Sequence, residues 1–182
     1  MNNKLFLNFL LSTLLLASCF VMGNATSQQD TEACNAAGCY KAHKGAWFDI
    51  KYPADFTSRD IQKSSTRQTG ADASVFLSPD KSVEFYIYSP QWGGVAPMIE
   101  LNPKTERLDA TQKSKAKNGV ITWTTISALN GDYLRSYQDF LSEDQNIHWV
   151  IGIKYRNQAS YNRYKEQYLF FKKSLQQYSD RR

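Results

Sequence analysis

Large apolar residues recur at every second position in several short stretches of the first half of the chain. This alternation occupies residues 47–52, where Pro53 ends it, and residues 83–88, with a short apolar run between them at 74–77. A period of two indicates β-strands with one buried face. Residues 89–103 contain three prolines and a Gly-Gly pair, so we expect that segment to be irregular.

The second half of the chain has the pattern of an antiparallel meander. An Asn-Gly pair at 118–119, the sequence most typical of a tight hairpin turn, separates stretches at 106–117 and 120–129. Further turns lead to predicted strands at 133–141 and 147–155. The last strand should bury one face, formed by Ile147, Trp149, Ile151, Ile153 and Tyr155.

A helix should complete the domain. From about Ser160 the apolar residues follow helical spacing, and Lys172 and Lys173 suit the carboxyl end of a helix because their charge opposes its dipole. The apolar stripe consists of Tyr161, Tyr164, Tyr168, Phe171 and Leu175. We therefore predict an α+β fold, a single domain over residues 46–180 with an antiparallel meander sheet packed against helices that include this amphipathic one.

The amino-terminal residues have the layout of an export signal. Lys4 precedes an almost unbroken apolar run at residues 5–16. A positive start, an apolar centre and small residues at the cleavage site define a secretory signal peptide, which we place at residues 1–25.

Two processing sites compete within this signal. Residues 16–19, Leu-Ala-Ser-Cys, resemble the lipobox of bacterial lipoproteins, in which the cysteine, here Cys19, is lipidated and becomes the first mature residue. Residues 23–25, Gly-Asn-Ala, fit an ordinary cut after Ala25. The first cut predicts a lipid-anchored protein of the periplasmic cell envelope, and the second predicts a soluble periplasmic or secreted one.

The two remaining cysteines fit an oxidising compartment. Residues 26–45 are rich in small and polar residues, and we expect them to form a tether that carries a Cys34–Cys39 disulfide. Such a short loop stabilises by only about 2 kcal/mol on the loop-entropy model. The four-residue spacing is that of neither a redox-active pair nor a haem attachment site, and no further zinc ligands lie nearby.

Charge says little about partners. The formal net charge of +5 falls to +4 when Lys4 is removed, and the charged residues are scattered along the chain. We expect no nucleic-acid partner for an exported protein. The expected partners are the membrane, through the lipid anchor, and an envelope protein or a cell-wall component.

The sequence contains no recognisable catalytic motif. His43 and His148 are the only histidines. We expect His43 to be solvated in the tether, and His148 to lie opposite the core face of its strand, under a helix or at the surface. There is no G-x-S-x-G elbow, phosphate-binding glycine loop or H-E-x-x-H pair. We therefore expect neither enzyme activity nor a metal or cofactor, although two carboxylates that meet only in the fold would escape this reasoning.

Aromatic residues supply the first binding candidates, Tyr86, Tyr88 and Trp92. Trp92 falls in the irregular segment, next to the Gly-Gly pair, where an aromatic side chain can stack on a sugar or anchor a protein partner. The alternative for the two tyrosines is that they fill the second face of a sheet covered on both sides.

Three lysines supply the second candidate. Lys113, Lys115 and Lys117 alternate along one predicted strand and would form a small anion-binding stripe. The alternative is that they protect an edge strand from aggregation.

The order of elements resembles the PsbP-like superfamily, which includes a photosystem II extrinsic subunit and many small bacterial lipoproteins. The resemblance covers residues 46–178. It rests on the meander and on two short motifs, Phe48-x-Ile50-x-Tyr52-Pro53-x-x-Phe56 and Phe170-Phe171-x-x-Ser174-Leu175. It implies an antiparallel sheet between helices, in a family whose members mostly act as accessory or binding proteins.

Together these features predict a noncatalytic envelope lipoprotein that acts as an accessory or binding module in the periplasm. Two alternatives stay open. One is an inhibitor that blocks an exported hydrolase with the loop around Trp92, and the other is an envelope hydrolase with carboxylates that the sequence does not reveal.

Overall fold

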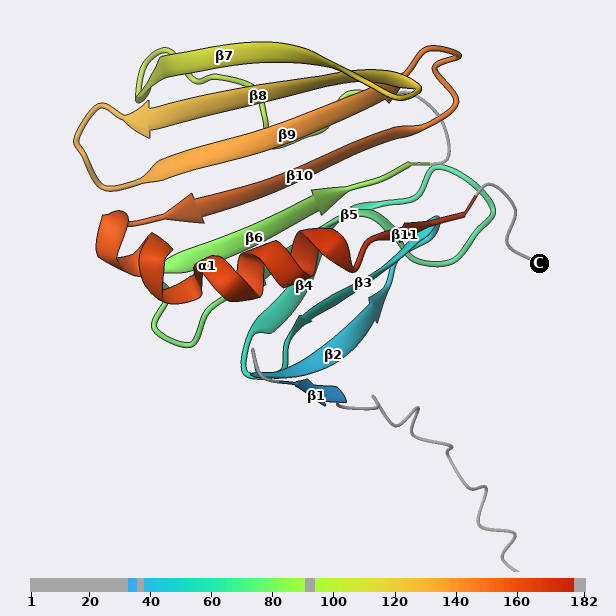
Figure 1. The fold of residues 1–182 in the computed structure, drawn as a ribbon, viewed down its shortest axis with the longest axis horizontal. Coiled ribbons are helices and arrows are strands. Elements are labelled where there is room, and N and C mark those ends of the chain that lie inside the picture. Colours follow the sequence, from blue (N-terminus) through green and yellow to red (C-terminus); the bar gives the residue numbers. More distant parts are fainter. Residues whose placement is uncertain (1–32, 36–37, 91–93, 179–182) are drawn as a thin grey trace, which may run out of the picture.

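The computed structural model describes residues 33–35, 38–90 and 94–178, and most of them belong to two antiparallel sheets. The large sheet has the order β4-β5-β6-β10-β9-β8-β7, and the small sheet has the order β1-β2-β3-β11 (Figure 1). The strands of the large sheet are β4 (Thr57–Lys63), β5 (Ala71–Leu77), β6 (Val83–Tyr88), β7 (Glu106–Ala116), β8 (Gly119–Ala128), β9 (Leu134–Ser142) and β10 (His148–Tyr155). Those of the small sheet are β1 (Ala33–Asn35), β2 (Gly38–Lys44), β3 (Phe48–Pro53) and β11 (Gln176–Gln177).

The predicted meander is present as β7, β8, β9 and β10. The Asn-Gly pair turns β7 into β8, where Ala116 lies opposite Gly119. β10 then pairs with β6, so the meander joins the hairpins of the first half in one continuous sheet. The pattern of the sequence therefore located these strands and their turns.

The main core lies where α1 (Gln158–Lys173) and β3 pack on the centre of the large sheet. Phe76, Phe85 and Ile153 lie side by side across β5, β6 and β10, and all three are almost completely buried. Tyr164, Tyr168 and Phe171 of α1 cover them, as the helical stripe predicts. The rest of this cluster is Phe48, Ile50, Tyr52, Phe56, Val83, Ile87 and Ile151.

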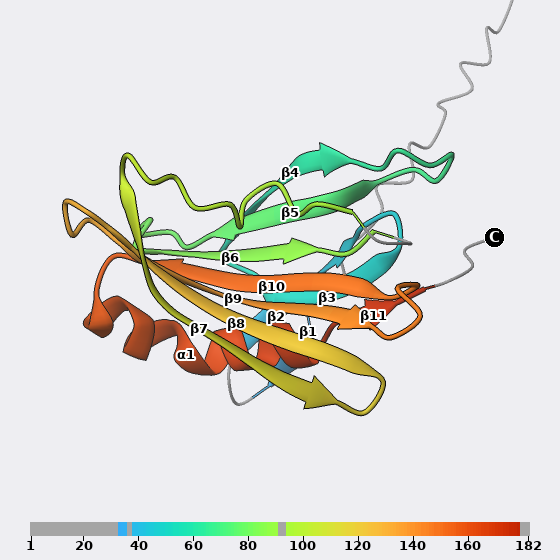
Figure 2. The same ribbon diagram turned by 90° about the horizontal axis from the view of Figure 1, so that it is seen from above.

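A second, smaller core fills the opposite face of the large sheet. The described later part of the irregular segment between β6 and β7, residues 94–105, runs along that face, away from α1 (Figure 2), and places Ala96, Met98 and Ile99 against it. β10 is therefore buried on both faces: Val150 belongs to this second core. Ile147, expected on the core face, lies before β10 and is 46% exposed.

The α+β class is confirmed, but helices do not sandwich the sheet. In the described ranges α1 is the one helix, and it begins close to the expected Ser160, where Asn157 caps it by accepting a hydrogen bond from the backbone N–H of Ser160. The second face carries the irregular segment instead. Within the same ranges, no helix is long and apolar enough to span a bilayer.

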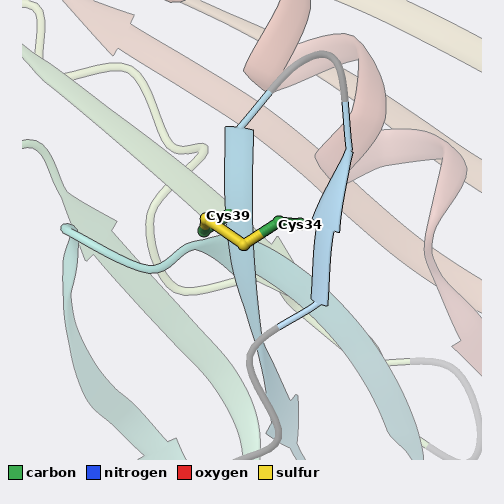
Figure 3. Close-up of a disulfide and its surroundings, with 2 residues drawn as sticks. All are labelled: Cys34 and Cys39. Carbon is green, nitrogen blue, oxygen red and sulfur yellow. A yellow bond between two sulfur atoms is a disulfide. The ribbon is translucent and has the colours of Figure 1, made fainter.

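The expected tether is part of the folded domain over its described second half. β2 pairs with β3, and Tyr40 is 1% exposed with its ring centre 4.0 Å from that of Phe170. β1 and β2 form a small hairpin in which Cys34 lies opposite Cys39, and the two are joined by the expected disulfide (Figure 3). The structured domain therefore begins before residue 46.

Candidate functional site

Two of the candidate residues lie outside the described residues and two are in the interior. Cys19 and Trp92 belong to the first group. Tyr86 and Tyr88 are each 2% exposed and belong to the second core, beneath the segment that contains Met98. The two tyrosines therefore fill the second face of the sheet and offer no binding surface.

The three lysines lie at an exposed edge. Lys113 and Lys115 are on β7, the last strand of the large sheet, and Lys117 is in the turn that follows. Nine consecutive residues of β7 are exposed. Among the described residues none of these lysines forms an ion pair, whereas Arg107 at the other end of β7 is bound to Asp109 at 2.9 Å. The carboxyl-terminal half of this edge thus carries uncompensated positive charge.

An apolar patch adjoins the lysines. Lys115 lies opposite Val120 on β8, which in turn lies opposite Leu141 on β9. Directly opposed residues share a sheet face, and Val120 and Leu141 are 41% and 38% exposed. The edge therefore offers a partner both charge and apolar area.

His43 is packed between the two sheets, whereas the sequence predicted a solvated side chain. Its Nε2 lies 3.0 Å from the Oγ of Ser74 and 3.4 Å from Oδ1 of Asp60, and the Ser74 hydroxyl donates to the same Asp60 oxygen at 2.8 Å. The residue types are those of a catalytic triad, but both partners face one ring nitrogen and Ser74 is fully buried. A triad needs the carboxylate on the other nitrogen and an accessible hydroxyl. The cluster therefore links the sheets.

His148 is 7% exposed on the second face of the large sheet. Its Nε2 lies 2.9 Å from Oδ1 of Asp139, and its ring meets that of Tyr88 edge-on. It lies neither under the helix nor at the surface, because the second core encloses it.

A buried ion pair holds the irregular segment against the second face. Arg135 on β9 lies 2.5 Å from Oε2 of Glu106, and its guanidinium also donates to the carbonyls of Met98 and Glu100. Oε1 of Glu106 accepts from the Tyr133 hydroxyl at 2.7 Å. Burial alone would raise the pKa of Glu106, but the hydrogen bonds from Arg135, Tyr133 and a backbone N–H outweigh it and hold that pKa below its ordinary value. This pair is structural, since it has no open side.

A hollow of about 200 Å³ lies between α1 and strands β8, β9 and β10. We call it the aromatic groove. Its floor comes from opposed positions of the strands, with Trp123 facing Gln138 and Thr125 facing Ser136. Its wall is the side of α1 on which Tyr161, Tyr168 and Lys172 recur at intervals of seven and four residues. Tyr155 closes one end, 5.1 Å from the Tyr161 ring. The groove exists because α1 packs on β6 and β10 and leaves the same face of β9 and β8 partly uncovered.

Polar groups in the groove lack protein partners. Among the described residues, neither the Gln138 amide nor the Trp123 indole N–H forms a hydrogen bond, and Lys172 has no carboxylate partner. The Lys172 ammonium lies 5.1 Å from the centre of the Tyr168 ring. Burial lowers the pKa of Lys172. The groove therefore combines aromatic faces, unused hydrogen-bonding groups and one half-buried positive charge.

A second hollow, of about 180 Å³, lies at the end of the large sheet near the start of β6. Its lining includes Glu84 and Asp132 as well as Lys154, whose ammonium lies 4.0 Å from the centre of the Tyr133 ring. Burial raises the pKa of Glu84 although Lys154 and Arg59 oppose the shift. Two carboxylates in one hollow are the arrangement that the sequence alone did not reveal. Among the described residues no group of three or more His, Cys, Asp or Glu side chains is placed to hold a metal ion.

Comparisons with known proteins return similar structures but no similar sequence. No protein-family model matches the chain, and no curated protein sequence matches it. The solution structure of cyanobacterial PsbP (CyanoP) from Synechocystis sp. PCC 6803 matches with a TM-score of 0.48 at 10% identity, over 80% of this chain and 98% of that one. The Saccharomyces cerevisiae Ran-binding protein Mog1p matches with a TM-score of 0.40 at 8% identity, over 81% and 97% of the two chains.

Proposed function

We propose that this protein is a noncatalytic, lipid-anchored binding module of the bacterial cell envelope that recruits an acidic partner protein by strand addition at β7. The observation that carries the proposal is an eleven-residue edge strand, exposed over nine consecutive residues, whose last lysines have no ion-pair partner in the described part of the chain. A free edge presents a row of backbone donors and acceptors to an incoming strand.

The lysines make this edge selective. Lysine on an edge strand discourages pairing with another chain, because it leaves a positive charge facing whatever strand arrives. An incoming strand with carboxylates opposite Lys113 and Lys115 would remove that barrier. The same residues that prevent aggregation thereby favour one class of partner.

The edge can be tested by site-specific photo-crosslinking in cells. A crosslinking residue at position 113 or 115 should capture a discrete partner, and the same residue at Lys81, an exposed position at the far end of the sheet, should not. Charge reversal of Lys113 and Lys115 to Glu should abolish capture from position 111, also exposed on β7. Equal capture from β7 and from position 81 would reject the edge as the binding surface.

The anchor has a separate test. Labelled palmitate should enter the wild-type protein but not Cys19→Ser, and the Cys19→Ser protein should be recovered in the soluble fraction. Absence of label from both proteins would favour the cut after Ala25 and a soluble periplasmic or secreted protein.

A hydrolase remains the second candidate because Glu84 and Asp132 line one hollow. A carboxylic acid with a raised pKa beside a second carboxylate is the pair that glycoside hydrolysis requires. Chromogenic glycosides should then be cleaved by the wild type and not by Glu84→Gln, and no turnover by the wild type would remove this candidate. The inhibitor alternative depends on Trp92 and is tested by comparing hydrolase inhibition by wild type and Trp92→Ala.

A further inference from the structure

We propose that the aromatic groove is a binding site for a single acidic sugar ring, with the sugar carboxylate on Lys172 and its hydroxyls on Gln138 and the Trp123 indole. This site is independent of the β7 edge and goes beyond the proposed protein-binding function. Its argument rests on the shape, the composition and the unused polar groups of one hollow.

The size of the groove selects the size of the ligand. Pockets for drug-sized molecules typically measure about 300–1,000 Å³, whereas this groove measures about 200 Å³. One pyranose ring fits that space, and a longer oligosaccharide would have to extend from the open side.

The aromatic residues select a ring with an apolar face. Trp123, Tyr155 and Tyr161 are half-buried, and each comes from a different element. Aromatic side chains bury a large area against a partner while keeping a polar end available. A pyranose presents C–H groups on its faces and hydroxyls around its rim, which matches aromatic walls with polar groups at the margin.

The charge of the groove selects an anion. Placing an ammonium away from water is unfavourable unless an opposite charge compensates it, and Lys172 is half-buried with no carboxylate partner in the described part of the chain. Lys173, its neighbour in the last turn of α1, is exposed and does not line the groove. A ligand carboxylate would supply the missing charge through a charge-assisted hydrogen bond. A neutral sugar would leave Lys172 uncompensated.

Titration of the intact protein with D-glucuronate, D-glucose and acetate, followed by NMR, tests the proposal. Glucuronate should shift the indole N–H signal of Trp123 and the side-chain amide signals of Gln138 at millimolar concentration. Glucose should cause much weaker shifts, and acetate, which lacks a ring, should leave the Trp123 signal unchanged. A glucuronate-containing oligosaccharide in a fourth arm separates the two sources of this ligand: tighter binding than the monosaccharide assigns the end of a polymer, and equal or weaker binding assigns the free sugar.

Variants test whether Lys172 is the residue that binds the sugar carboxylate. Lys172→Met should weaken glucuronate binding about tenfold and leave glucose binding unchanged, and Lys172→Arg should retain the preference for the acid. Lys165→Met, at an exposed position of the same helix, is the matched control and should bind like the wild type. No shift of Trp123 or Gln138 with glucuronate, equal shifts with acetate, or wild-type affinity of Lys172→Met in a folded protein would each overturn the proposal.

Discussion

Removal of Arg135 should destabilise the domain more than almost any other single change at a polar position. The Arg135 and Glu106 side chains are 7% and 6% exposed, and the guanidinium also donates to two carbonyls of the irregular segment. Breaking a buried ion pair by removing one partner costs about 3–5 kcal/mol because the other charge stays buried without compensation. Arg135→Met should therefore lose about 3–5 kcal/mol, a large part of the 5–15 kcal/mol typical of a folded domain.

A mutant cycle measured by urea unfolding separates the ion pair from loss of packing. Glu106→Gln should cost about 1–2 kcal/mol, because it loses the charge but its amide oxygen, placed at the Oε2 position, still accepts from Asn102 and Arg135. The amide nitrogen then takes the Oε1 position, where the Tyr133 hydroxyl must turn from donor to acceptor. The double variant should be more stable than the sum of the two losses predicts, by about 1–3 kcal/mol. Arg107→Met, at a side chain 69% exposed on β7, is the control and should change stability by less than about 0.5 kcal/mol.

The pH dependence gives the same cycle an independent readout. The folded-state pKa of Glu106 is lowered from its ordinary 4.5. A carboxyl group whose pKa is lowered by folding contributes its full stabilisation above the unfolded-state pKa. That contribution disappears as the pH falls through the lower, folded-state pKa. Glu106→Gln should therefore lose stability less steeply than the wild type below about pH 4.5. Additive losses in the cycle, or an Arg135→Met protein within about 1 kcal/mol of the wild type, would refute this account of the buried pair.

Three further substitutions test contacts that hold the fold together. Burial would raise the pKa of Asp80, but hydrogen bonds from the neighbouring serines outweigh it and lower that pKa to about 2. Asp80→Asn should therefore destabilise the fold by about 1 kcal/mol, a value already reduced for solvent screening. It should also make the loss of stability between about pH 4 and pH 2 less steep than in the wild type. Gly152→Ala should lower the melting temperature by an amount equivalent to about 1–3 kcal/mol, since its Cβ would overlap the ring of Tyr137; unchanged melting would contradict the tight approach. Tyr40→Ala should reduce the free energy of unfolding by about 3–5 kcal/mol, measured with urea, because the ring is buried against Phe170. A loss below about 1 kcal/mol would show that β2 behaves as a tether and not as part of the folded domain.

The meander and the helix were predictable because each carries a strong local pattern. The Asn-Gly turn and the alternation in β6 and β10 are properties of neighbouring residues, and so is the helical spacing of Tyr164, Tyr168 and Phe171. Each of these patterns was confirmed. The single-faced burial expected for β6 and β10 was incomplete, because Tyr86, Tyr88 and Val150 pack against a segment that is distant in the sequence.

The missed strands lack such a pattern for a physical reason. β4 is an edge strand whose first four residues are exposed, so it needs no alternation of apolar residues. β2 buries only Tyr40 completely, and the rest of the strand contains Lys, His, Ala and Cys. In both strands the stabilisation comes from backbone pairing with a better-patterned neighbour, which a single segment does not reveal.

The aromatic groove was not predictable for a related reason. Lys172 was interpreted as a charge at the end of a helix, and Tyr161 and Tyr168 as members of an apolar stripe, and both interpretations are correct as far as they go. What makes these residues a candidate site is that Trp123 and Gln138 lie beside them, and that proximity depends on where α1 packs on the sheet. The sequence contained one hint of this site: Lys172 lies on the same side of the helix as the apolar stripe, and no acidic residue lies one turn before it to form an ion pair.

The two proposed binding surfaces lie on the same extension of the fold. α1 and the small sheet cover β5, β6 and β10, and these elements together contain most of the large buried side chains. In contrast, β7 is exposed and β8 is mostly half-buried. Substitutions at Lys113, Lys115 and Lys172 therefore remove little buried area and should change stability by less than about 1 kcal/mol. Loss of binding in these variants is then attributable to the surface itself. A protein that loses both stability and binding on substitution of Lys115 would show that the extension is part of the core and that its exposed edge is not available to a partner.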